Sequence, residues 1–170
     1  MSYPLMAAQA AKEIDEIYIS TDSPTIIEVA KDFDVQIIER PPELATGSAL
    51  GEDAYVHGFE YIRDVLDKPI ELIVLLFCNA PTILGETLDK GIQILREDEE
   101  LDSAVTVSSY NMWSPIRARK KGPDGLLHPF VPFEAFGELK AINCDRDSQG
   151  DIFFADMSVS IVRPRCLENL

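Results

Sequence analysis

Polar residues that could bind an anion or a sugar follow three stretches of apolar sequence. They are Ser20-Thr21-Asp22, then Arg40 ahead of Pro41-Pro42, and then Asn79 ahead of Ala80-Pro81-Thr82. Because ligands bind at the carboxyl ends of the strands in parallel sheets, these loops predict a binding crevice on one edge of a sheet. Strand ends also need turn-forming residues for purely structural reasons, which is the alternative interpretation of each loop taken alone.

Helical and strand periodicities alternate along the chain and would position these loops. The pattern predicts helices over 5–13, 24–32, 52–66 and 86–96, and strands over 16–20, 35–39, 70–77, 103–108, 116–119, 139–143 and 152–162. The segment 70–77 has no polar alternation, which is typical of a strand buried on both faces. Together these elements predict an α/β fold, a three-layer sandwich with a mostly parallel sheet, in a single domain over residues 1–170.

Composition excludes several classes of function. The 170 residues carry 30 acidic and 15 basic side chains, for a formal net charge of −15. Such a charge should repel nucleic acid and anionic membranes. The longest apolar run is too short to span a bilayer, and the first residues do not have the pattern of a signal peptide. With Cys78, Cys144 and Cys166 far apart in the sequence, we expect a cytoplasmic protein without a disulfide framework.

Three further groups of residues have open interpretations. Asp22 could support a magnesium ion through water, or it could cap the helix that begins near Ser23-Pro24. The loop 145–156 has acidic residues near calcium-loop spacing, but its flanks are predicted strands, so a hairpin loop is favoured. The basic segment 117–121 is either a solvated hairpin or a flap that points Arg117 and Arg119 at an anion.

Longer segments resemble a known family. The stretches "ISTD" (19–22) and "RPPELA" (40–45) are the most specific, with further similarity in "IVLLFCNAPTILGETLDKGIQIL" and "LDSAVTVS". They resemble the acylneuraminate cytidylyltransferases, which activate acidic sugars as CMP-sugars. The resemblance covers roughly residues 3–170, and it implies a fold like that of the nucleotide-diphospho-sugar transferases.

The resemblance implies an activity and a set of binding residues. The anomeric hydroxyl of an acidic 2-keto sugar would attack the α-phosphorus of CTP, and pyrophosphate would leave with the help of Mg²⁺. Ser20, Asp22, Arg40 and Asn79 are the candidate nucleotide-binding residues. From family position and charge, the candidate sugar-binding residues are Arg117, Arg146 and Gln149. The implied cellular role is polysaccharide biosynthesis, and the implied assembly is a homodimer.

The sequence also departs from the family pattern. The family's first strand with its phosphate-binding loop has no counterpart, nor does the later aspartate pair that holds the metal, and Phe77 replaces a glutamine. In the family's sheet that first strand lies between the segments 16–20 and 70–77. These segments should therefore either pair directly or keep unpaired backbone edges.

Two hypotheses about function follow from these departures. One is a CTP-dependent cytidylyltransferase, of which this chain is an incomplete piece that is inactive alone. The alternative is a non-catalytic domain of the same fold that binds sugar or nucleotide or serves in assembly.

Overall fold

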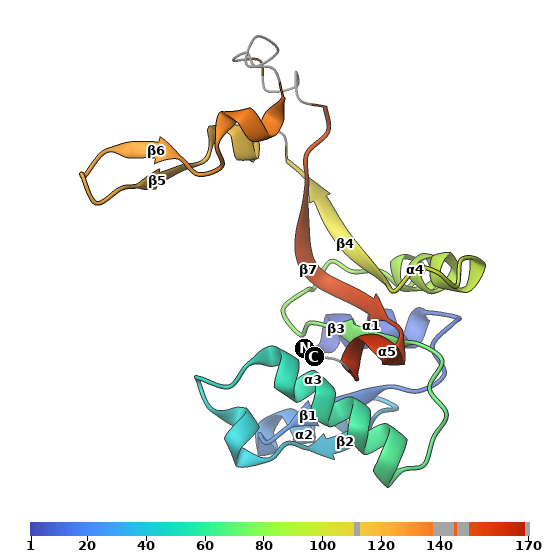
Figure 1. Ribbon diagram of the computed structural model, residues 1–170. Coiled ribbons are helices and arrows are strands. Elements are labelled where there is room, and N and C mark those ends of the chain that lie inside the picture. The colour runs from blue at the N-terminus through green and yellow to red at the C-terminus, as the bar shows by residue number, and fades with distance from the viewer. Residues whose placement is uncertain (111–112, 138–144, 146–149, 169–170) are drawn as a thin grey trace. The chain divides into compact units, whose positions relative to one another are not determined.

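The computed structural model describes residues 1–110, 113–137, 145 and 150–168 (Figure 1). Its contacts group the chain into two compact units. The first unit combines residues 1–106 with 157–170, and the second comprises residues 107–156. The expectation of one domain over 1–170 stays a prediction, because compact units within a chain can belong to one domain.

Helices and strands alternate through the first unit, as the sequence predicts. The helical segments are α1 (Ser2–Ala10), α2 (Pro24–Ala30), η1 (Pro42–Ala45), α3 (Gly51–Glu60), η2 (Tyr61–Val65), α4 (Gly85–Glu97), η4 (Pro115–Arg117), η5 (Phe133–Phe136) and α5 (Pro164–Leu167). The strands are β1 (Tyr18–Thr21), β2 (Gln36–Glu39), β3 (Ile73–Leu76), β4 (Ser103–Ser109), β5 (Arg119–Lys121), β6 (Leu127–Pro129) and β7 (Phe153–Val162).

The predicted α/β class is confirmed, and the strand pairing is mixed. β1 and β2 form a parallel pair, with Tyr18 opposite Gln36 and Thr21 opposite Glu39. β7 lies between β3 and β4 in a second sheet and runs antiparallel to β3, with Ile73 opposite Val162 (Figure 1). β5 and β6 form an antiparallel hairpin in the second unit. The sheet is therefore less parallel than the alternation of elements predicts, because β7 enters it from the far end of the chain.

Most predicted elements are present with shifted ends, and one is wrong in part. The helix predicted over 52–66 is α3 followed by one π-helical turn, η2, where the amide of Leu66 bonds the carbonyl oxygen of Tyr61. Of the strand predicted over 116–119, Ile116 and Arg117 instead lie in the 3₁₀ turn η4, because Pro115 fixes a helical φ at its first position, and Arg119 begins the strand β5. The strand predicted over 139–143 lies outside the described residues.

β1 and β3 do not pair with each other among the described residues; they lie in separate sheets. The sequence predicts that these strands either pair directly or keep unpaired backbone edges. Among the described residues each strand keeps one edge without a ladder partner. β2 satisfies the other edge of β1, and β7 satisfies the other edge of β3.

Two apolar clusters cover the two faces of the β3–β7 pair. On one face, Val159 and Ile161 of β7 pack with Ala8 of α1 and with Leu88 and Ile92 of α4. On the other face, Val162 packs with Phe59 of α3 and Leu167 of α5. Because alternate residues of a strand point to opposite faces, the sequence of β7 supplies both clusters. This double burial positions the end of β3 and the start of α3, which border the candidate site.

One arginine joins the end of β7 to the end of α4. The Arg163 guanidinium donates to the carbonyl oxygens of Leu95 (2.5 Å), Asp98 (3.2 Å) and Leu101 (2.8 Å). The last carbonyl groups of a helix have no partner within the helix and carry partial negative charge, so a cation there is favourable. Arg163 therefore closes α4 and fixes β7 against it.

Replacement of Arg163 by methionine should lower the free energy of unfolding by about 1–3 kcal/mol, since it leaves those carbonyl groups without a charged donor. Urea unfolding followed by circular dichroism measures the loss. Lys31→Met is the control, because Lys31 forms an exposed ion pair with Glu28 on α2, and such pairs contribute less than about 1 kcal/mol. Equal losses for the two variants would contradict the capping role of Arg163.

Candidate nucleotide-binding site

Arg40 joins the carboxyl ends of β1 and β2. Its backbone amide donates to the Thr21 carbonyl oxygen at 3.0 Å and so extends the parallel ladder by one residue. Its side chain turns back across β1, where Nη2 donates to the Ser20 carbonyl oxygen at 2.6 Å and Nε to the Ser20 Oγ at 3.2 Å. Pro41 and Pro42 follow at once and cannot continue the ladder. The structure thus brings together Ser20 and Arg40, two of the residues predicted from the sequence.

The turn after β1 is held by Thr21 rather than by Asp22. Thr21 is buried, and its Oγ1 accepts the amide of Ser23 at 3.1 Å. Ser23 is the residue before α2 and Pro24 is its first residue, as predicted, but no side chain caps this helix. Asp22 is exposed at the same edge. The alternative in which Asp22 caps α2 is not seen, because the helix has no side-chain cap and the Thr21 hydroxyl holds the preceding turn instead. The role of Asp22 in supporting magnesium stays a prediction.

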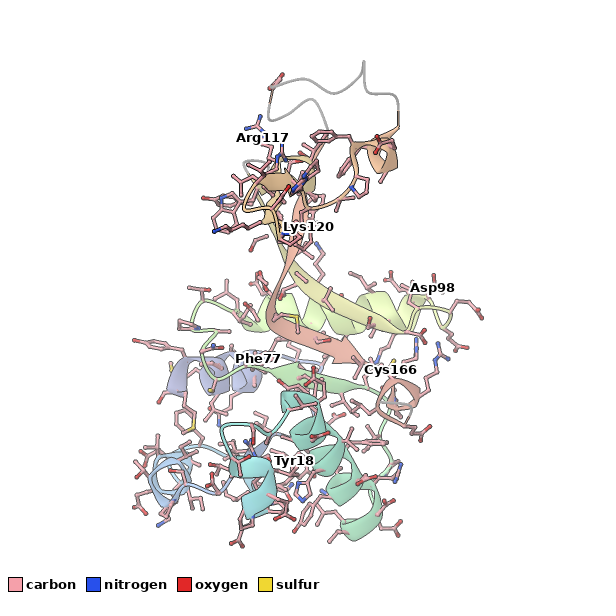
Figure 2. The ribbon with its side chains drawn as sticks, turned by 60° about the vertical axis from the view of Figure 1, so that its left-hand side comes forward. Tyr18, Phe77, Asp98, Arg117, Lys120 and Cys166 are labelled. Atoms are coloured by element: carbon pink, nitrogen blue, oxygen red, sulfur yellow. The ribbon has the colours of Figure 1, made fainter. Side chains whose placement is uncertain are left out.

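The first turns of α3 bring an aromatic residue to this edge. The Tyr55 ring meets the Phe77 ring edge to face, with centroids 5.9 Å apart and planes at 89°. Phe77 directly follows β3, as Figure 2 shows, and its amide bonds the Ser158 carbonyl oxygen at 3.2 Å. Phe77 therefore packs against Tyr55, at the position where the family pattern has a glutamine.

Burial and nearby side chains shift the pKa of Tyr55. Burial is the main cause that raises the pKa of Tyr55 above its ordinary value, and the Glu52 carboxylate raises that pKa further. The positive Arg40 guanidinium lowers the pKa of Tyr55, and the Cys78 side chain raises it. Tyr55 therefore lies within electrostatic range of the residues that follow β2 and β3. Tyr55 and Glu52 are not among the site residues predicted from the sequence. Their place at the start of a helix just after the Arg40 loop is the signal that could have identified them.

The remaining predicted site residues make no described contact with Ser20 or Arg40. Asn79 is exposed in the turn after β3, where the Ala80 amide bonds the Phe77 carbonyl oxygen at 3.2 Å. Arg117 lies in η4 of the second unit, exposed to solvent (Figure 2). Arg146 and Gln149 lie outside the described residues. The roles of these four residues stay predictions.

A cavity of about 250 Å³ borders Tyr55 and Phe77. Its other lining residues come from α3, β3, β7, α5 and the start of β4, and are Glu52, Leu75, Ser103, Met157, Ser160, Val162, Cys166 and Leu167. A second cavity of about 490 Å³ lies by the opposite ends of β1 and β2, where Asp15, Glu16 and Asp34 line it. Those carboxylates would repel a triphosphate. The Arg40 edge is therefore the better candidate for an anionic ligand.

The described residues contain no cluster of three or more His, Cys, Asp or Glu side chains arranged to hold a metal ion. They also contain no helix that is both long and apolar enough to cross a membrane. Within this part of the chain, Arg40 supplies the positive charge beside the strand ends.

Two solved structures share this fold. One is a CMP:2-keto-3-deoxy-manno-octonic acid synthetase complexed with CTP, at 14% identity and a TM-score of 0.62 over 99% of this chain and 64% of that one. The other is the 4-diphosphocytidyl-2C-methyl-D-erythritol synthase of Anaerococcus prevotii, at 18% identity and a TM-score of 0.60 over 98% of this chain and 62% of that one. The chain thus spans slightly less than two thirds of either protein, and its fold is nucleotidyltransferase-like.

The sequence profile of the Cytidylyltransferase family matches residues 1–118, which include β1, β2, β3 and the Arg40 loop. The chain belongs to this family.

Tyr55 gives a direct test of the site's electrostatics. Because its pKa is raised by burial and by Glu52, its phenol should ionise at higher pH than free tyrosine in a spectrophotometric titration. The folded state holds the Tyr55 proton more tightly than the unfolded state does. This contribution to the free energy of unfolding is fully present below the ordinary pKa of 10.0 and is lost as the pH rises through the raised pKa of the folded state.

The variant Tyr55→Phe should therefore lose less stability than the wild type between pH 10 and the raised pKa. Tyr18, whose pKa is also raised by burial, serves as the comparison through Tyr18→Phe. A Tyr55 that titrates like free tyrosine would show that the hydroxyl is not enclosed as the structure has it.

Proposed function

We propose that the protein is a CTP-dependent cytidylyltransferase that activates an acidic 2-keto sugar as its CMP-sugar. The anomeric hydroxyl would form a bond to the α-phosphorus of CTP and lose its proton, and the bond to the leaving pyrophosphate would break. Membership of the Cytidylyltransferase family supports the nucleotide half of this proposal. The acidic sugar is carried by the sequence resemblance in residues 19–22 and 40–45.

The observation that carries the proposal is the position of Arg40. Its guanidinium lies half-buried at the carboxyl ends of two parallel strands, where it bonds Ser20. A guanidinium can donate two parallel hydrogen bonds to a phosphate, which suits it to the triphosphate of CTP. Ser20 would hold Arg40 in place and exchange its bonds for phosphate oxygens on binding, while Asn79 and Asp22 contact the nucleotide from neighbouring loops.

The sugar would be bound by Arg117, Arg146 and Gln149, since a guanidinium pairs readily with a sugar carboxylate. A divalent metal, expected to be Mg²⁺, would offset the charge that develops on the phosphates. The described residues do not form a cluster of side chains that fits this metal. We further propose a cytoplasmic homodimer.

Titration calorimetry with CTP tests the nucleotide site on this chain. We expect CTP to bind, and we expect Arg40→Ala to weaken binding by about ten- to a hundredfold, as the loss of a charged hydrogen bond predicts. Arg40→Lys should recover only part of the affinity, because an ammonium cannot donate the paired bonds.

Lys31→Ala is the matched control, since Lys31 pairs with Glu28 on the surface of α2. Circular dichroism of every variant separates a binding loss from unfolding. Equal affinity of the wild type and Arg40→Ala for CTP would overturn the assignment of Arg40. Binding of CTP without CMP transfer to any acidic 2-keto sugar, by the longest natural form of the chain, would favour the non-catalytic alternative.

A further inference from the structure

The cavity beside Tyr55 and Phe77 extends from the apolar interior of the first unit to solvent. Its volume is about 250 Å³. The buried side chains of Val162 and Leu167 line it, and so does the exposed side chain of Glu52. A ligand in this cavity would therefore meet an apolar wall on one part of its surface and a carboxylate on another.

The size and lining of this cavity favour one part of a nucleotide. Pockets for drug-sized ligands measure about 300–1,000 Å³, so a cavity of about 250 Å³ takes only a part of such a ligand. The apolar wall is unfavourable for a triphosphate, and the Glu52 carboxylate would repel both a triphosphate and the carboxylate of an acidic sugar. A flat base, with apolar faces and hydrogen-bonding edges, suits the same lining.

The two rings on the wall can hold a base but cannot choose it. The Tyr55 and Phe77 rings meet edge to face, with centroids 5.9 Å apart, so each fixes the position of the other. Stacking of a base on an aromatic side chain is favourable for every base, because every base has a π face. The rings therefore contribute affinity, and the choice of base must come from a polar group.

Glu52 is the polar group on this cavity that can make the choice. An ionised carboxylate accepts hydrogen bonds and cannot donate them. Cytosine has an amino group at position 4, whereas the corresponding group of uracil or thymine is a carbonyl oxygen. A carboxylate beside this edge therefore attracts cytosine and repels uracil.

The neighbouring residue Asp53 separates this role from a general effect of charge. Glu52 and Asp53 both lie in the first turn of α3, where a carboxylate also stabilises the helix. Of the two, Glu52 lines the cavity and Asp53 does not. Helix stabilisation is thus common to both residues, and contact with a bound base is expected of Glu52 alone.

We propose that the cavity holds the cytosine of CTP and that Glu52 distinguishes cytosine from uracil by accepting a hydrogen bond from the 4-amino group. This inference rests on the proposed function. Arg40 would bind the phosphates, which CTP and UTP share, so overall affinity and base choice belong to different residues. Both Glu52 and Arg40 shift the pKa of Tyr55, which places both charges within electrostatic range of the cavity wall.

Titration calorimetry of the full chain with CTP and with UTP tests the proposal. The wild type should prefer CTP by about tenfold or more, as one matched base contact predicts. Glu52→Gln should bring the two affinities close together, because an amide can either accept from the cytosine amino group or donate to the uracil carbonyl oxygen. Its affinity for UTP should therefore rise above that of the wild type, a gain that damage to the fold does not produce.

Two control variants accompany this measurement. Asp53→Asn removes the same charge from the same turn, and it should keep the preference for CTP. Arg40→Ala should weaken the binding of CTP and UTP by similar factors and so leave their ratio unchanged. Circular dichroism of each variant checks that the helices are retained.

The outcomes separate this inference from the proposed function. Binding of CTP and UTP with equal affinity by the wild type would overturn the inference while the nucleotide site remains. A preference for CTP that survives Glu52→Gln would do the same, as would an equal loss of preference in Asp53→Asn. Failure of the wild type to bind either nucleotide would overturn both the inference and the proposed function.

Discussion

The hydrogen-bonding requirement of the β1 backbone is the constraint on which the candidate site depends. A strand has two rows of donors and acceptors, and β2 satisfies only one row of β1. At Ser20 the other row is met by the Arg40 side chain, which reaches back from the end of β2. The residue best suited to bind a phosphate is therefore also the residue that completes the strand edge, so its position is fixed before any ligand arrives.

Helix α3 borders the candidate site from the carboxyl end of β3. Its first turns follow the Arg40 loop by only ten residues, so the chain returns quickly to the carboxyl end of β3. There Tyr55 packs on Phe77, and Glu52 and Arg40 shift its pKa in opposite directions. An aromatic wall beside a held guanidinium is a chemistry that suits a nucleotide, whose base is flat and whose phosphates are anionic.

Strand β7 explains why the sheet is mixed and why its position is well defined. It comes from the far end of the chain, enters between β3 and β4, and buries alternate side chains in two separate clusters. Arg163 then ties its end to the last carbonyl groups of α4. Because a shift of one residue would exchange the two faces, the alternation of β7 leaves one register available.

The sequence by itself determined the α/β class, the order of the elements through β4 and the polar ends of β1 and β2, because these depend on local periodicity and turn chemistry. It placed Ser20 and Arg40 in one site, but it could not show that they bond each other. Only the tertiary structure decided that β7 pairs antiparallel with β3, that Thr21 holds the turn assigned to Asp22 and Ser23, and that Tyr55 joins the site. The physical reason is that periodicity specifies which face of an element is buried, whereas the neighbour on that face is chosen by contacts between residues far apart in the chain.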